Sequence, residues 1–233
     1  MTTPPTQDPQ AARRRPGRPS RPADDPQHAE VRDRLLVAAT ELAVERGLDG
    51  AGIREIADRA GVSSGMISYY FGDRAGLEEA MSQRALTELA SEFAKAIAER
   101  SRDSDLLDML IHVHATALSA NPWLPRLVAR DVLGVDRDSR ARISSQMGQG
   151  PMQLLRDTIQ EAIDSGALRA DLDPDMCVLT IASTGAFPYL MAPLLADHLD
   201  IEFDDDFRDR LIAHNRDLLA NGLRTPAQRE KLE

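Results

Sequence analysis

The sequence has little of three things: cysteine, aromatic residues and long apolar runs. Its single cysteine, Cys177, excludes a framework of disulfides within the chain. Only 4% of the residues are aromatic, whereas alanine, leucine, arginine and acidic residues are abundant, and this mixture favours helices over sheets. No apolar run approaches the roughly 18 residues of a membrane-spanning helix, and no apolar stretch follows the amino-terminal arginines as it would in a secretory signal. We therefore expect a cytoplasmic, all-α protein.

Charge is unevenly distributed along the chain, which carries a net charge of −10 at pH 7. Residues 1–22 contain five arginines and one acidic residue, whereas residues 1–75 are neutral overall, so the rest of the chain carries all of the negative charge. A basic start and an acidic remainder are compatible with a DNA-facing end joined to a part that avoids DNA. Coding bias towards arginine is the other reading, and composition alone leaves both open.

Apolar side chains recur at helical spacing after a first segment that is rich in proline, arginine and glutamine. That segment, residues 1–28, is expected to be a disordered arm. No alternating strand pattern is evident. One helix is expected to be interrupted or kinked at Pro188 and Pro193, because proline removes a backbone donor. The predicted helices are 29–46, 53–60, 64–70, 74–99, 104–119, 123–134, 151–165, 174–195 and 206–221.

The segment 53–71 meets the residue requirements of a helix-turn-helix. Ala57 is small, as it must be where the second helix crosses the first, and Gly61 can adopt the positive φ that ends the first helix. Ser63 or Ser64 can cap the second helix, whose amide hydrogens suit a phosphate. The shared buried face is predicted to consist of Ile56, Ala60, Val62 and Ile67. An ordinary helical hairpin with a glycine turn is the simpler alternative.

The outer face of the second helix weighs against that alternative, because it lacks the acidic residues of a merely solvated surface. A short, uncharged polar face is compatible with base edges and phosphates, which would repel carboxylates. The residues of this face are Ser64, Gly65, Met66, Ser68 and Tyr69.

Residues 29–81 resemble the DNA-binding domain of TetR-family regulators. The matching stretches are I-R-E-I-A-D-R-A-G-V-S-S-G and Y-Y-F-G-D-R-A-G-L-E-E-A-M. The resemblance implies that residues 63–69 lie near the major groove, and that Tyr69, Tyr70 and Arg74 lie near the DNA backbone. The sequence departs from the family at three positions, where threonine, a basic residue and tyrosine are common: Gly52, Ser64 and Ser68.

The arm adds a second feature that is typical of DNA binding. Residues 13–19, Arg-Arg-Arg-Pro-Gly-Arg-Pro, resemble the core of an AT-hook, in which arginine enters a narrow A·T minor groove. A solvated basic tail is the alternative. The residues predicted to contact DNA are Arg13, Arg14, Arg15, Arg18, Arg54, Ser63, Ser64, Gly65, Met66, Ser68, Tyr69, Tyr70 and Arg74.

The resemblance implies three parts: the arm at 1–28, the helix-turn-helix domain at 29–73, and a helical ligand-binding and dimerisation domain at 74–233. Small residues would let another helix approach closely, so helices 174–195 and 206–221 are predicted to form a homodimer interface. Packing within one chain fits the periodicity equally well. The small residues are Ala182, Ser183, Gly185 and Ala186.

A ligand pocket in this domain would be apolar with few polar groups and would take a small apolar or amphipathic effector. His114 lies on the apolar stripe of helix 104–119, where a hydrogen-bonded core histidine is more common than a ligand contact, and Trp123 likewise is more commonly a core residue or an anchor at the helix start. Asp108 and His112 share a helix face without a third ligand, so no metal site is predicted. The residues predicted to bind ligand are Leu110, His114, Trp123, Leu127 and Phe187.

These features favour a DNA-binding repressor that a small-molecule effector releases from its operator. A DNA-binding regulator without such an effector, controlled by a protein partner, is the alternative. An all-α enzyme is disfavoured, because the sequence lacks paired carboxylates, a nucleophile with an obvious base and a phosphate loop. No cofactor is expected.

Overall fold

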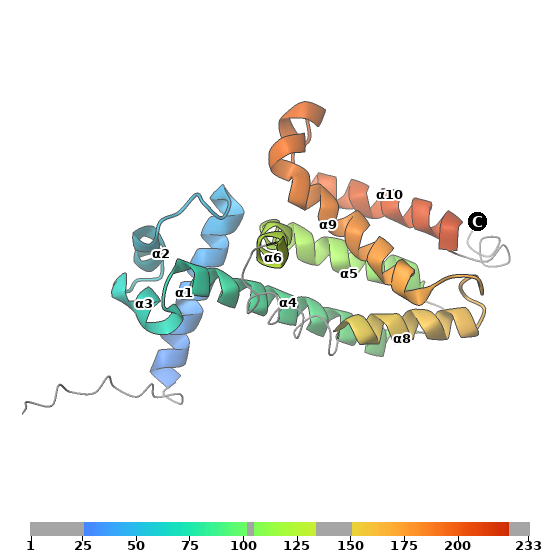
Figure 1. Ribbon diagram of the computed structural model, residues 1–233, viewed down its shortest axis with the longest axis horizontal. Helices are drawn as coiled ribbons and strands as arrows, with labels where there is room; N and C mark the ends of the chain where they lie inside the picture. The colour runs from blue at the N-terminus through green and yellow to red at the C-terminus, as the bar shows by residue number, and fades with distance from the viewer. Residues whose placement is uncertain (1–25, 102–104, 134–150, 224–233) are drawn as a thin grey trace, which may run out of the picture.

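The computed structural model describes residues 26–101, 105–133 and 151–223, and every regular element in these ranges is an α-helix. The all-α prediction is therefore confirmed for the described chain. The helices, labelled as in Figure 1, are α1 (Pro26–Arg46), α2 (Ile53–Arg59), α3 (Gly65–Phe71), α4 (Arg74–Glu99), α5 (Leu106–Ala120), α6 (Leu124–Leu133), α8 (Pro151–Asp164), α9 (Pro174–Leu199) and α10 (Asp205–Leu223).

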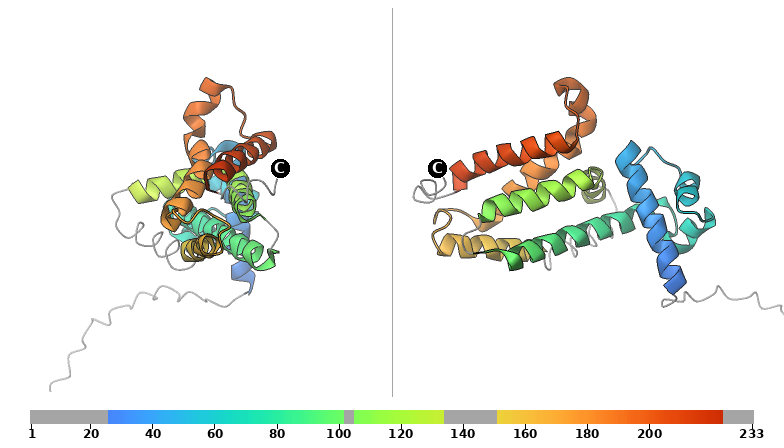
Figure 2. Two further views of the ribbon diagram at one scale, coloured as in Figure 1. Left: turned by 90° about the vertical axis from the view of Figure 1, so that its right-hand side faces the viewer. Right: turned by 180° about the vertical axis from the view of Figure 1, so that it is seen from behind.

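The helices form two parts that α4 connects. Figure 1 shows α1, α2 and α3 gathered at one end of the molecule, with α4 running away from them beside α8. In the second part α5 packs against α4, α9 and α10, and α9 also packs against α6 and α8. Seen from the front and from behind, α10 lies on one side of this bundle and α4 with α8 on the other (Figures 1 and 2). The architecture is a helix-turn-helix unit joined by a long helix to a helical bundle.

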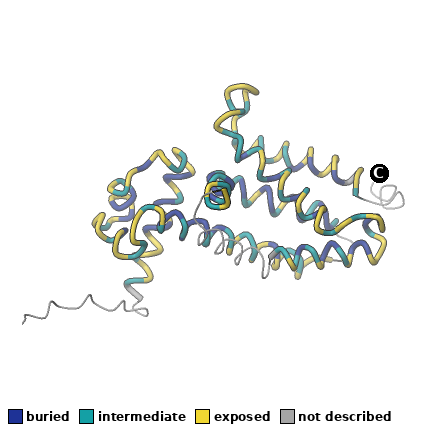
Figure 3. Tube along the Cα trace, in the orientation of Figure 1, coloured by how far each residue is buried: buried dark blue, intermediate teal, exposed yellow. Residues whose placement is uncertain are grey.

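Two apolar cores hold these parts together, and the first one crosses from the amino-terminal helices into the bundle. It contains Leu35, Leu42 and Ile67, but also Trp123 and Leu127 from the region of α6. The second core lies between the helices α4, α5, α8, α9 and α10. Figure 3 shows the buried stretches on the helix sides that face one another. The first core thus continues from the amino-terminal helices through α4, against which α6 packs, to Trp123 and Leu127.

Two predicted features of the backbone need correction. α1 begins at Pro26, so the last three residues of the predicted arm are helical. Proline is favourable at a helix start, because its missing N–H would have no partner there. The prolines at 188 and 193 lie inside α9, which continues to Leu199, so the predicted interruption is absent, whereas the bend of α9 agrees with the predicted kink (Figure 1). Residues 1–25, with the arginines of the arm, lie outside the described residues.

The expectation that no apolar run is long enough to span a membrane is wrong for α9. Its 26 residues are long and apolar enough by length and composition. In the structure α9 packs against α5, α6 and α8. Only part of its surface is covered in the single chain: Cys177, Ile181 and Tyr189 are buried, whereas Leu179 and Phe187 are exposed.

The packing of Ala57 yields a first prediction, for the variant Ala57→Leu. Ala57 is fully buried in the first core, so three added carbon atoms have no space, and we expect a loss of about 1–3 kcal/mol in unfolding free energy. Urea denaturation of the full chain measures it. Ala94→Leu places the same side chain at an exposed position of α4 and should change the stability little. Equal stability of the two variants would contradict the close packing at Ala57.

Candidate nucleic-acid interface and buried cavity

The turn between α2 and α3 has the geometry that the sequence predicted. Gly61 has a φ of 67°, a conformation that favours glycine. The Val62 amide donates a hydrogen bond of 3.0 Å to the carbonyl oxygen of Ala57, which closes the turn beneath α3. Ile67, on the underside of α3, is fully buried. These contacts fix α3 across α2, so that the other side of α3 faces outwards.

The start of α3 differs from the prediction, because neither serine caps it with its side chain. Ser64 already has helical backbone angles, and no side-chain hydrogen bond satisfies the first amides. The amides of Met66 and Ile67 instead bond to the carbonyl oxygens of Ser63 and Ser64, at 3.0 and 3.2 Å. Both serine side chains are exposed and lie at the outer end of the helix.

The residues predicted to face DNA separate into an outer and an inner group. Tyr69 is 42% exposed, whereas Met66 is partly buried and packs against the first core, which corrects its assignment to the outer face. Tyr70 also packs against this core and its hydroxyl oxygen is buried, so its ring does not lie on the surface that Tyr69 occupies. The exposed members are Arg54, Ser63, Ser64, Gly65, Ser68 and Tyr69.

The start of α1 lies beside this outer group. The ring of His28 makes edge-on contacts with Tyr69 and Tyr70, at centroid distances of 5.9 and 6.0 Å. The chain that precedes α1 therefore joins the structure next to the carboxy-terminal end of α3. Arg13, Arg14, Arg15 and Arg18 lie outside the described residues.

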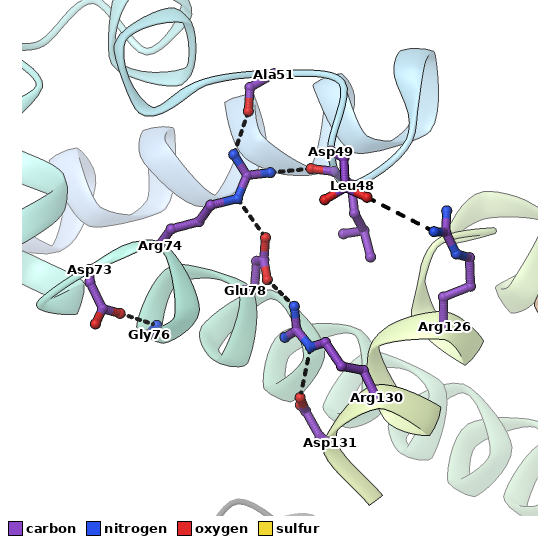
Figure 4. A network of polar contacts seen from close by, with 10 residues as sticks. All are labelled: Leu48, Asp49, Ala51, Asp73, Arg74, Gly76, Glu78, Arg126, Arg130 and Asp131. Carbon is purple, nitrogen blue, oxygen red and sulfur yellow. Dashed lines mark hydrogen bonds and ion pairs between the residues drawn. The ribbon is translucent and has the colours of Figure 1, made fainter. Parts of the chain in front are cut away.

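Arg74 lies in contacts within the protein, whereas the family resemblance placed it near the DNA backbone. Its Nη1 donates to the Ala51 carbonyl at 2.6 Å, Nη2 donates to the Leu48 carbonyl, and Nε donates to Glu78 Oε1 at 2.8 Å (Figure 4). Both carbonyls belong to the loop between α1 and α2. All three nitrogens of the guanidinium thus have protein acceptors, and Arg74 holds this loop against α4.

Glu78 extends the network to the bundle. Its side chain is buried, with 6% of the residue exposed, and Oε2 accepts a hydrogen bond of 2.5 Å from Nη1 of Arg130 on α6. A second arginine of α6, Arg126, lies 4.0 Å from the carboxylate of Asp49 in the same loop. Figure 4 shows the resulting chain of contacts from the loop through α4 to α6. The sequence analysis missed this network, which joins residues up to 52 positions apart.

A cavity of about 160 Å³ lies in the bundle between α4, α5, α6, α8 and α9. Its described lining consists of apolar side chains and one histidine. Leu110 and His114 line it, as predicted from the sequence. The lining residues are Leu86, Leu89, Ala90, Phe93, Leu110, His114, Leu118, Leu124, Pro125, Val128, Met152, Leu155, Ile159, Val178, Ile181, Ala182 and Ala186.

Three residues predicted to bind ligand lie elsewhere. Trp123 and Leu127 are buried in the first core, which extends into α6. Phe187 is 55% exposed on α9. Periodicity identified all three as apolar helix residues, but it does not say which neighbour each one meets. The ligand-binding prediction also omitted residues of α4 that line the cavity, such as Leu89 and Phe93, which belong to the apolar stripe of that helix.

His114 combines the two roles that the sequence left open. Its ring stacks near Phe93 and packs against Gly185, where a Cβ atom would lie 2.4 Å from Nδ1. Burial lowers the pKa of His114 to about 4, although a hydrogen bond to the backbone of Ile181 acts in the opposite direction. The ring is therefore neutral at pH 7, hydrogen-bonded within the protein, and also part of the cavity wall.

Three of the four small residues of α9 face the inside of the chain, which corrects their assignment to a dimer interface, whereas Ser183 is exposed. Gly185 accommodates His114, and Ala182 and Ala186 line the cavity. The outer surface of α9 and α10 instead carries exposed large apolar side chains, namely Met176, Leu179, Phe187, Leu194 and Leu218. Packing within the chain thus accounts for most of the small-residue stripe.

Comparisons with known proteins agree with this arrangement. Residues 35–81 match the family model described as "Bacterial regulatory proteins, tetR family". The HTH-type transcriptional repressor KstR2 of Rhodococcus jostii (strain RHA1) is 23% identical over 164 residues, which are 70% of this chain and 80% of the relative. The HTH-type transcriptional activator FasR of Mycolicibacterium smegmatis is 43% identical over 68 residues, which are 29% of this chain and 31% of the relative.

Solved structures share the fold over most of the chain. FadR from Bacillus subtilis in complex with stearoyl-CoA superposes with a TM-score of 0.59 at 18% identity and covers 78% of this chain and 96% of its own. The ketosteroid transcriptional regulator KstR2 of Mycobacterium tuberculosis superposes with a TM-score of 0.55 at 20% identity, and covers 83% and 95%. At these identities the likeness concerns the fold.

The burial of His114 yields a second prediction, on stability in acid. The folded state holds the pKa near 4, whereas an unfolded histidine titrates near 6.5, so the unfolded chain binds the extra proton first. The contribution of the neutral His114 to the free energy of unfolding is thus present above about pH 6.5. It falls as the pH drops towards 4, by at most about 3 kcal/mol. Urea unfolding between pH 7 and 4 should show a shallower pH dependence in His114→Phe than in the parent. Parallel curves would exclude a neutral, buried His114.

Proposed function

We propose that the chain, whose residues 35–81 match the TetR family model, is a DNA-binding transcriptional repressor of this family that a small effector releases from its operator. One observation carries this proposal: the same chain presents an uncharged, exposed face on α3 and encloses an apolar cavity bordered by α4, the helix that follows α3 directly. A ligand that fits only one position of α4 would change the population of conformers in which α3 fits DNA.

The proposed DNA-contacting surface is the outer group on α2 and α3, together with the arm. Ser68 and Tyr69 supply hydroxyl donors and acceptors without a carboxylate, which suits phosphates and base edges. The arm joins the protein beside Tyr69, through His28. Its arginines at 13–15 and 18 would therefore start close to the same stretch of duplex and reach a neighbouring minor groove.

The proposed effector is a small apolar or amphipathic molecule in the cavity, and His114 supplies its hydrogen-bonding partner. The described lining contains no charged side chain, so we place the apolar body of the effector against it and any charged group outside it. Two proteins of similar fold, a ketosteroid regulator and a regulator in complex with stearoyl-CoA, are also associated with molecules that have large apolar bodies. The existence of the cavity favours an effector over control by a protein partner alone.

We further propose a cytoplasmic homodimer that packs through the outer faces of α9 and α10. The large apolar side chains exposed there in the single chain include Leu179, Phe187 and Leu218. Covering them with a second copy would bury apolar area that is otherwise in water. A two-fold dimer would also present two α3 helices to two half-sites of one operator.

The uncharged face of α3 yields a third prediction. Ser68→Asp places a carboxylate beside the DNA phosphates, and we expect operator affinity to fall about tenfold or more, which corresponds to roughly 1.4 kcal/mol. Fluorescence anisotropy with a duplex identified by mapping the sites bound in its own genome measures the affinity. Ser91→Asp, at an exposed position of α4, is the matched control. Equal affinities for the two variants would place the DNA surface elsewhere.

The cavity yields a fourth prediction, on effector release. Titrating the operator complex with neutral apolar compounds should weaken DNA affinity for those that fit the cavity. Ala182→Trp, which fills the cavity wall between α8 and α9, should abolish this response and leave DNA binding in place. Ser91→Trp places the same side chain at an exposed position of α4, outside the cavity lining and the proposed dimer faces, and serves as the control. Affinity that is unchanged by a broad apolar panel would contradict an effector-released repressor.

A further inference from the structure

α6 has one side at the cavity and another at the contacts that hold the helix-turn-helix unit. Leu124, Pro125 and Val128 line the cavity. Arg130, two residues beyond Val128, donates to the buried carboxylate of Glu78. A displacement of α6 by a cavity occupant would therefore change the geometry of the ion pair between Arg130 and Glu78, because only a few residues of one helix separate the two contacts.

Glu78 is a suitable carrier of such a displacement. A buried carboxylate is stable only when its partners compensate for the lost hydration. Its two oxygens are taken separately: Oε1 accepts from Arg74 at 2.8 Å and Oε2 from Arg130 at 2.5 Å. If Arg130 moves away, Arg74 is left as the single cationic partner of the Glu78 carboxylate. The guanidinium of Arg74 would then have to rearrange to compensate for the charge.

Arg74 in turn sets the position of the loop between α1 and α2. It donates to the carbonyl oxygens of Leu48 and Ala51. This loop leads directly into Ile53, the first residue of α2, which α3 crosses. Rearrangement of the Arg74 guanidinium would shift the acceptors on which the loop is held, and with them the start of α2.

We propose that Glu78 and Arg130 are positioning residues that transmit occupancy of the cavity to the helix-turn-helix unit through Arg74 and the loop at 48–51. This inference rests on the proposed function for its ligand, but its ion pair is defined by the structure alone. A purely stabilising ion pair would lower the stability of the whole chain when it is removed. Removal of a transmitting ion pair would in addition uncouple the loop from the cavity.

The experiment uses the full chain and N-phenyl-1-naphthylamine, a neutral apolar fluorophore, as the cavity probe. Fluorescence titration gives the affinity of the probe, and hydrogen–deuterium exchange of peptides covering residues 47–56 gives the response of the loop. In the parent chain we expect the probe to change loop exchange about fivefold. In Arg130→Met the probe should bind with similar affinity, whereas the change in loop exchange should largely disappear.

Two further variants separate transmission from stability. Arg156→Met breaks another arginine–carboxylate pair, with Asp175 at the other end of the bundle, and should keep the loop response. Arg130→Lys retains a charge that reaches one carboxylate oxygen and should restore part of the response. If Arg130→Met proves unstable, Glu78→Gln, which keeps the size and loses the charge, replaces it.

The outcomes distinguish this proposal from the one on which it rests. Probe binding without any loop response in the parent, or a response that persists in Arg130→Met, would overturn the transmitting role and leave the effector cavity standing. A parent chain that does not bind the probe would contradict both the cavity and the relay. A response lost equally in Arg156→Met would identify a general effect of stability and likewise overturn the relay.

Discussion

The crossing of α3 over Ala57 is the constraint from which the exposed face of α3 follows. A fully buried alanine lets the two helices meet closely, and the positive φ of Gly61 turns the chain within the few residues available. The underside of α3 is then occupied by Ile67, which leaves Ser68 and Tyr69 on the outside. The exposure of that outer face is therefore a consequence of packing, because Ser68 and Tyr69 have no place in the core.

A second consequence concerns how the two parts of the molecule are joined. α4 alone would be a flexible connection, because a single helix fixes only one direction. α6 adds contacts on both sides of this connection: Arg130 pairs with Glu78 of α4, and Arg126 lies 4.0 Å from Asp49 in the loop between α1 and α2. A change in the spacing between α4 and α6 would therefore act on Glu78 and, through Arg74, on the loop between α1 and α2.

The sequence predicted the features that depend on neighbours within one or two helical turns. The helices, the turn at Gly61 and the buried Ala57 all follow from periodicity and glycine placement, and all are confirmed. Contacts between distant helices were less accessible: Arg74 turns towards loop carbonyls, and its partner Glu78 pairs with a residue 52 positions away. Trp123 and Phe187 were both assigned to the cavity because both are apolar residues of predicted helices. One lies in a core and the other is exposed, a difference that only the tertiary packing decides.

α9 shows why its composition was ambiguous in two respects. Its small residues suggested a helix–helix interface and its apolar length suits a membrane span, yet each face has a separate neighbour. Gly185 receives the His114 ring, Ala182 and Ala186 form part of the cavity wall, and Phe187 projects from the opposite side. The apolar residues of α9 therefore have three different surroundings: the His114 ring, the cavity and, on the outer surface, solvent. An occupant that displaced the cavity wall would move this outer surface with it, so ligand binding and the packing of a second copy would be coupled through one rigid helix.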